Sequence, residues 1–157
     1  MKMQLLQRLL FLAMLALAPV IAPQVAFAQG KAEHAGKVHL TLLVVHATNA
    51  ETGIDPSLQA FAQSFRHLNY KGFRLLSTQS SDVTLNNDAH FKIEGNREVK
   101  VTLLSRDENN VRVRMEMTGK SGKLLDTTVK VNRDGTFIVA GPQYKDGILI
   151  LPLRASY

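Results

Sequence analysis

The chain has no cysteine and no tryptophan among its 157 residues, and only 6% of it is aromatic. Without cysteine, disulfides, thiolate metal ligands and thiol nucleophiles are all excluded. A lipoprotein anchor is excluded too, because its acyl chains are attached to a cysteine directly after the signal peptide. We therefore expect the folded state to be stabilised by the burial of apolar side chains alone.

The first 28 residues have the three-part order of a secretory signal peptide. Lys2 and Arg8 lie in a short basic start, Leu9 to Leu17 form an apolar run, and Ala26-Phe27-Ala28 ends the segment with small residues. This order predicts cleavage after Ala28. The short leader and its Ala-x-Ala end are typical of bacteria, so we expect a periplasmic or secreted protein.

An uncleaved membrane anchor is the alternative interpretation of this leader. A spanning helix needs about 20 consecutive apolar residues, and Pro19 and Pro23 interrupt the stretch here. We therefore expect no stable membrane anchor. After cleavage, residues 29–37 form a polar, flexible lead-in, and residues 38–157 form a single domain that is long enough to bury a proper core.

The charge balance argues against nucleic acid as a partner. The whole chain has 19 basic and 13 acidic residues, and loss of Lys2 and Arg8 with the leader leaves 17 against 13. The remaining basic residues are spread along the chain with acidic residues between them, whereas nucleic-acid binders concentrate them on one patch. We expect from this excess a soluble protein and a weak attraction to anionic envelope surfaces.

One segment gives a clear helix signal. Asp55 is a suitable N-cap, and Pro56 fits the first helical position, where an N–H would be unpaired in any case. Apolar residues then recur at spacings of three and four: Leu58, Phe61, Ala62, Phe65 and Leu68. This stripe predicts a helix with one buried face. With a predicted strand on either side, the region is interpreted as a βαβ-like or split βαβ unit. The sequence leaves open whether the two strands touch.

Alternating apolar and polar residues predict a series of strands, most with one buried and one wet face. Short Gly-, Asn- and Asp-containing turns separate them and indicate an antiparallel meander. The predicted strands are 38–46, 73–76, 91–94, 99–103, 111–117, 125–131, 136–140 and 148–153, and the polar tract 77–87 is expected to be a loop or an irregular strand. The predicted fold is α+β. It has one mainly antiparallel, curved sheet of about six or seven strands, and one helix near the N-terminus of the mature chain covers it.

The last predicted strand is apolar on both faces from Ile148 to Leu151. Such a run is typical of a central strand covered on both sides, which we favour, or of an edge strand that pairs with a partner chain. In the second case Ile148 and Ile150 are the pairing residues. Because proline cannot donate to a ladder, Pro152 predicts that the strand ends there or lies at an edge.

The connection before this strand is a candidate contact loop. Residues 141–147 are expected to place Pro142 and Tyr144 at the tip of a hairpin, next to Lys145. Tyrosine is common in binding hot spots because it offers a large contact area at a small entropic cost. The alternative is a plain connection whose tyrosine folds back on the sheet.

The wet faces of the later strands form a second candidate surface. They carry several basic side chains that could receive an anionic partner, but acidic residues share the same strands. Cross-strand ion pairing is therefore the favoured interpretation. The basic residues are Lys100, Arg112, Arg114 and Lys130, and the acidic ones are Glu98, Glu116 and Asp126.

Reaction chemistry has little support in the sequence. The five histidines lack the spacing of metal ligands, so we expect no metal and no cofactor; they are His34, His39, His46, His67 and His90. No Gly-x-Ser-x-Gly elbow precedes a helix. A weak hydrolase hypothesis rests on the cluster of Ser77, Ser80, Ser81 and Asp82, which His46 or His90 could approach.

Three functions therefore remain open, and no motif carries a resemblance to a known family. We favour a non-enzymatic exported module that binds another envelope or secreted protein or a surface component. The second hypothesis is a carrier that holds a small apolar ligand between the helix and the sheet, near Phe61 and Phe65. The third and weakest is a small hydrolase with its site at 77–82. The sequence leaves the oligomeric state open.

Overall fold

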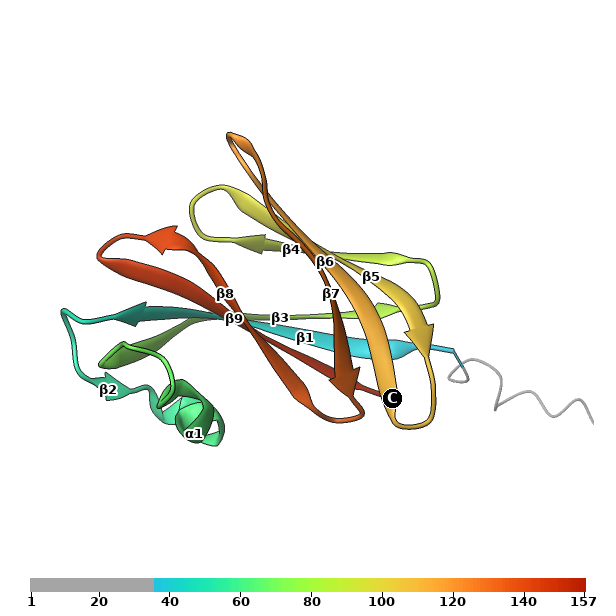
Figure 1. Ribbon diagram of the computed structural model, residues 1–157, viewed down its shortest axis with the longest axis horizontal. Helices are drawn as coiled ribbons and strands as arrows, with labels where there is room; N and C mark the ends of the chain where they lie inside the picture. The colour runs from blue at the N-terminus through green and yellow to red at the C-terminus, as the bar shows by residue number, and fades with distance from the viewer. Residues whose placement is uncertain (1–35) are drawn as a thin grey trace, which may run out of the picture. The chain divides into compact units, whose positions relative to one another are not determined.

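The computed structural model describes residues 36–157. The predicted signal peptide (1–28) and most of the lead-in (29–37) lie outside the described residues. The strands are β1 (Val38–Thr48), β2 (Gly53–Ile54), β3 (Gly72–Val83), β4 (Asp88–Ile93), β5 (Arg97–Arg106), β6 (Asn110–Gly119), β7 (Gly122–Asn132), β8 (Thr136–Tyr144) and β9 (Gly147–Ser156). They form two sheets, a five-stranded one in the order β2-β3-β1-β9-β8 and a four-stranded one in the order β4-β5-β6-β7 (Figure 1). Among the strands of residues 36–157, the short β2–β3 ladder alone is parallel.

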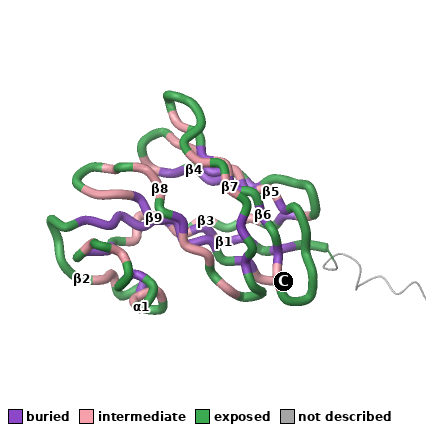
Figure 2. The backbone as a smooth tube through the Cα atoms, in the orientation of Figure 1, coloured by how far each residue is buried: buried purple, intermediate pink, exposed green. Residues whose placement is uncertain are grey.

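The main core lies between the two sheets. Every second side chain is buried along the middle of β5 and most of β6, as the alternation predicts: Val99, Val101, Leu103, Val111, Val113 and Met115 are fully buried. They share one apolar cluster with residues of β1 and β9 such as Leu42 and Leu151. Figure 2 shows that the buried stretches follow these strands, while the turns at both ends are exposed.

The predicted turns of the meander are confirmed, and local chemistry explains two of them. Between β4 and β5, Gly95 and Asn96 both have positive φ, 82° and 59°. The connection has three residues, 94–96, between the paired Ile93 and Arg97, and glycine and asparagine are residues that adopt positive φ readily. Between β5 and β6, the Asp107 carboxylate accepts hydrogen bonds from the N–H groups of Asn109 and Asn110, at 2.9 and 2.8 Å.

The other face of the five-stranded sheet is covered by a short helical segment. It consists of a 3-10 helix, η1 (Pro56–Phe61), and one turn of α-helix, α1 (Ala62–Phe65). Asp55 caps the segment by accepting a hydrogen bond from the Ser57 N–H at 2.9 Å, as predicted. Leu58 and Phe65 are fully buried in a second apolar cluster with Val45, Phe73 and Ile150.

The helical segment ends at Phe65, whereas the predicted apolar stripe continues to Leu68. The helix is therefore shorter than predicted, and its α-helical turn covers only part of the predicted range. Leu58 and Phe61 are three residues apart, which is the period of a 3-10 helix. Helical turns this short gain little from their own hydrogen bonds. Packing decides the conformation instead, since the rings of Phe65 and Phe73 stack with centroids 4.6 Å apart.

The prediction of mainly antiparallel, curved β structure with one helix is confirmed, but the predicted single sheet of six or seven strands and the predicted extent of the helix are wrong. The described residues form nine strands in two sheets. Alternation shows that one face of a strand is buried but not which layer covers it. The βαβ-like interpretation is also wrong, because β1 and β3 are antiparallel neighbours, whereas a βαβ unit joins parallel strands.

The prediction of a loop or irregular strand at 77–87 is corrected in part, because β3 continues to Val83. The ladder with β1 skips Leu76, so a bulge breaks the alternation there. Beyond the bulge, polar side chains pair across the two strands on an exposed face. The Oγ atoms of Thr41 and Ser80 lie 3.1 Å apart, and His39 Nδ1 lies 2.6 Å from Asp82 Oδ1.

The last strand, β9, is an interior strand with β1 on one side and β8 on the other. It continues past Pro152 to Ser156, so the prediction that Pro152 ends the strand or marks an edge is wrong. The β1–β9 ladder has no pairs between Leu42–Leu153 and Val45–Ile150. Pro152 lies in this gap, so the strand tolerates its missing N–H by leaving out part of the ladder.

Candidate functional site

One end of the five-stranded sheet gathers polar and charged residues from segments far apart in the sequence. In the last row of the sheet, Thr48 of β1 lies between Gly72 of β3 and Gly147 of β9, and Tyr144 of β8 pairs with Gly147. Two rows further in, on the same strand, His46 pairs with Arg74 of β3. We call His46, Thr48, Tyr144, Lys145 and Asp146 the end cluster.

Two of the predicted contact residues belong to this cluster, but the predicted seven-residue loop does not exist. β8 continues through Tyr144, and Lys145 and Asp146 alone form the turn to β9. Lys145 is exposed and has a positive φ of 51°. The half-buried Tyr144 ring meets the His46 ring edge-on at 5.4 Å, and the Lys145 Nζ lies 5.3 Å from the tyrosine ring centroid.

The hydroxyl of Thr48 links the β8–β9 turn to the loop after β1. It donates a hydrogen bond to Asp146 Oδ2 and accepts one from the Ala50 N–H at 3.0 Å. The hydrogen bond from Thr48 lowers the pKa of Asp146 below its usual range, and the turn's own backbone and the nearby His46 and Lys145 act in the same direction. The Asp146 carboxylate is therefore ionised at neutral pH.

Among the histidines of residues 36–157, His46 alone is buried, with 9% of its surface exposed. Its Nε2 atom lies 3.5 Å from Asp146 Oδ1 and makes no hydrogen bond. The backbone is closely packed beside it, since a Cβ atom added to Gly147 would lie 1.9 Å from the Ala47 carbonyl oxygen. Only glycine therefore fits the position after the turn.

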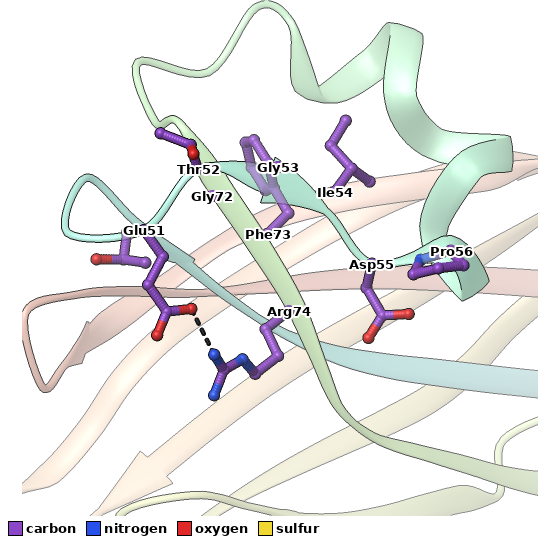
Figure 3. Close-up of a pocket in the computed structure, with 10 residues that line it drawn as sticks. Glu51, Thr52, Gly53, Ile54, Asp55, Pro56, Gly72, Phe73 and Arg74 are labelled. Atoms are coloured by element: carbon purple, nitrogen blue, oxygen red, sulfur yellow. Dashed lines mark hydrogen bonds and ion pairs between the residues drawn. The ribbon is translucent and has the colours of Figure 1, made fainter.

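A pocket of about 240 Å³ adjoins the end cluster and has Thr48 in its lining. Its charged groups are Glu51, Asp55 and Arg74, which extend to the same side of the β2–β3 ladder (Figure 3). Arg74 Nη2 donates to Glu51 Oε2 in an exposed ion pair. The closeness of the Glu51 loop to β3 explains Gly72, whose added Cβ would lie 2.6 Å from the Glu51 carbonyl oxygen.

The other predicted site residues lie outside the end cluster. Pro142 forms part of a bulge in β8 and lines a small slot of about 170 Å³ with Met117, Leu124 and Leu125. Ile150 is fully buried and Ile148 half-buried, both against the helical segment. Because β9 has a strand on each side, neither isoleucine can pair with a strand of another chain.

The serine cluster does not assemble with the histidines named for it. Ser80 bonds to Thr41, and Asp82 pairs with His39. His46 faces Asp146, whereas His90 Nδ1 lies 2.8 Å from Glu98 Oε1. Within residues 36–157 no three His, Asp or Glu side chains come together as possible metal ligands; His34 lies outside that range.

The space required by the carrier hypothesis is filled by side chains. Leu58 and Phe65 are fully buried between the helical segment and the sheet. Phe61 lies over Phe65 with ring centroids 6.0 Å apart, and Phe65 stacks on Phe73. An apolar ligand would have to displace these rings.

The outer face of the four-stranded sheet carries the cross-strand ion pairs favoured by the sequence. Lys100 lies 2.6 Å from Glu116, and Arg114 binds Asp126 through two hydrogen bonds of 2.8 and 2.7 Å. Lys123 contacts both carboxylates, at 3.1 Å to Glu116 and 2.7 Å to Asp126. These contacts hold the pKa of Asp126 well below its usual range. At the centre of this face, three basic side chains thus share two carboxylates.

Sequence reasoning missed Glu51, Arg74, Thr48 and Asp146 as members of a site. Glu51 and Arg74 are 23 residues apart, and Thr48 and Asp146 are 98 apart. No local spacing relates such residues; only the pairing of β1 with β3 and β9 brings them together. The Asp-Gly pair after Lys145 was the one usable signal, because such pairs mark tight hairpin turns.

No family model matches the chain, and no curated protein matches it. Among solved structures, the chain is similar to part of the T2SS secretin XcpQ from Pseudomonas aeruginosa, determined by cryo-EM, with a TM-score of 0.33 and 11% sequence identity. The match covers 76% of this chain and 55% of the secretin chain, so the chain spans about half the length of that protein. A likeness of this degree carries no conclusion about function. In the described part of the chain, no helix is both long and apolar enough to cross a membrane.

Proposed function

We propose that the chain is an exported module that binds another protein of the bacterial envelope, and that the end cluster is its contact surface. The observation that carries this proposal is the arrangement around Thr48. Its hydroxyl bonds to Asp146 in the turn that carries the exposed Lys145 and directly follows the half-buried Tyr144, and Thr48 also lines the pocket of Glu51 and Arg74. An aromatic ring and charges of both signs thus lie at one end of one sheet.

Such a surface suits recognition of a protein. Tyrosine supplies contact area, and exposed charges of both signs give orientation and specificity to an encounter more than raw affinity. The turn is well anchored, since Thr48 and the close contact at Gly147 fix it on β1. A contact surface that is already ordered loses little entropy on binding.

The test is capture of a partner in intact cells by the full, tagged chain after chemical crosslinking. Lys145→Asn removes the charge but suits the positive φ of the turn, because asparagine tolerates that conformation. Lys120→Asn, at an exposed position in the β6–β7 turn, is the matched control. We expect one protein to be captured equally by the wild type and the control, and at least about fivefold less by Lys145→Asn. Equal capture by all three chains, or no specific capture, would contradict the proposal.

A further inference from the structure

The pocket beside the end cluster contains an arginine whose contacts leave most of its donors available. A guanidinium has five N–H donors, and within residues 36–157 Arg74 makes one side-chain hydrogen bond, through Nη2 to Glu51. The side chains of both residues are more than half exposed. Exposed pairs of this kind are weak because water and salt screen them, so another carboxylate can replace Glu51.

Asp55 supplies a fixed negative charge on the same side of the pocket (Figure 3). Its Oδ1 atom accepts hydrogen bonds from the N–H and the hydroxyl of Ser57. These bonds hold the carboxylate in place and lower its pKa, and Arg74 adds a smaller effect in the same direction. The pocket thus presents a guanidinium and a carboxylate that do not depend on each other for their position.

We propose that this pocket binds a group that carries a carboxylate and an ammonium together. Arg74 receives the carboxylate, Asp55 receives the ammonium, and Glu51 is the resting counter-ion of Arg74 that the ligand displaces. This inference rests on the proposed function, because Thr48 makes the pocket part of the same contact surface.

Charge and size together favour this class of ligand. A simple anion would meet the carboxylates of Glu51 and Asp55, and a simple cation would meet Arg74, whereas a zwitterion satisfies both signs. The volume of about 240 Å³ is below the range of about 300–1,000 Å³ typical of drug-sized ligands. It suits a dipeptide, or one acidic and one basic side chain from a partner protein. Both the dipeptide and the pair of partner side chains offer a carboxylate and a cationic group at a short distance from each other.

The direct test is an NMR titration of the mature chain with glycylglycine. The signals observed are the backbone amides of Gly53 and Gly72 and the Nε–H of Arg74. N-acetyl-glycylglycine lacks the ammonium and glycylglycine amide lacks the carboxylate, so each removes one charge. We expect saturable shifts with glycylglycine, and affinities at least about tenfold weaker for both blocked compounds, since each loses a charge-assisted contact.

Four variants separate recognition from folding. Asp55→Asn keeps a good N-cap but removes the charge, and Arg74→Gln removes the guanidinium; each should weaken binding at least about tenfold. Glu51→Gln frees Arg74 and should tighten binding about two- to fivefold, which a purely structural role for Glu51 would not produce. Lys71→Gln, which removes a nearby charge outside the pocket lining, should leave the affinity unchanged.

The same variants in the cell-capture experiment distinguish the two sources of the ligand. If glycylglycine does not bind but Asp55→Asn and Arg74→Gln lose the captured partner, the paired charges belong to the partner, and the inference holds. If the partner is captured equally by these variants and no dipeptide binds, the inference is overturned while the proposed function stands. If no partner is captured at all, the proposed function fails and the titration alone decides on the pocket.

Discussion

The hydroxyl of Thr48, at the end of β1, donates a hydrogen bond to the carboxylate of Asp146, which lies 98 residues later in the β8–β9 turn. The same hydroxyl accepts a hydrogen bond from the Ala50 N–H, at the start of the loop that carries Glu51. One side chain therefore orders both the turn that presents Tyr144 and Lys145 and the edge of the charged pocket. Through Thr48, the β8–β9 turn and the loop after β1, which are far apart in the sequence, form one continuous surface.

Thr48→Val is expected to raise the pKa of Asp146 towards its usual value. The hydrogen bond from Thr48 is the largest cause of the lowered pKa, and valine has a similar shape without the hydroxyl. Because the folded-state pKa lies below the unfolded one, this bond stabilises the protein at neutral pH. The stabilisation is lost as the pH falls through the folded-state pKa of Asp146.

NMR titration of the Asp146 side chain measures the shift directly. Denaturant unfolding of wild type and Thr48→Val should show a difference at neutral pH that shrinks in acid. Thr128→Val, on the exposed face of β7, serves as the control and should not move the Asp146 titration. An unchanged Asp146 pKa in Thr48→Val would show that the hydrogen bond does not form in solution.

Gly147→Ala is expected to disturb the end of the five-stranded sheet. The new Cβ would lie 1.9 Å from the Ala47 carbonyl oxygen, and backbone atoms cannot move aside as a flexible side chain does. We expect a loss of at least about 1–3 kcal/mol of unfolding free energy, as for other overpacked sites. Gly36→Ala, where nothing lies within 4 Å, should be neutral in the same denaturant experiment.

Phe65→Ala should cost about 3–5 kcal/mol of unfolding free energy, as truncation of a buried aromatic ring does. Phe65 is fully buried and stacks on Phe73. Phe61→Ala, which removes a half-buried ring of the same size, should cost clearly less. A loss below about 1 kcal/mol for Phe65→Ala would mean that the helical segment does not cover the sheet as described.

Asp126→Asn should lower stability in a way that depends on salt. Asp126 binds Arg114 and Lys123, and its lowered pKa reflects these contacts. Added salt screens exposed ion pairs, so the unfolding midpoints of wild type and variant should converge as the salt concentration rises. Acid should remove the difference as well, but only far below the pH at which an ordinary aspartate titrates. A difference that persists unchanged in molar salt would count against an electrostatic origin.

The sequence predicted the strands of this fold better than their arrangement. Period-two alternation identifies buried positions such as Val101 and Val113 because neighbouring side chains point to opposite faces. The same alternation does not show whether β4 to β7 belong to the same sheet as β1 or form a second sheet. The prediction that β9 ends at Pro152 or lies at an edge was wrong for a physical reason. The gap in the β1–β9 ladder that accommodates the proline can be recognised only when the neighbouring strand is known.

The candidate site was only partly predictable. Tyr144 and Lys145 were identified from their residue types and their place in a predicted hairpin connection, but the predicted length of that connection was wrong because β8 continues through the bulge at Pro142. His46 looked like one of five scattered histidines, and only the fold shows that it is buried beside Asp146. The contacts of Thr48 with Asp146 and of Arg74 with Glu51 join residues that are far apart in the sequence.

Site-specific photo-crosslinking in intact cells asks whether the end cluster touches a partner protein. A photoreactive residue would replace Gln143, the exposed residue directly before Tyr144 in β8, or, as the control, Arg112 on the exposed outer face of β6, in otherwise identical tagged chains that keep Lys145. We expect irradiation to link one defined envelope protein at position 143 and not at position 112. Equal labelling at the two positions, or no adduct at position 143 in cells that export the protein normally, would contradict the proposed contact surface.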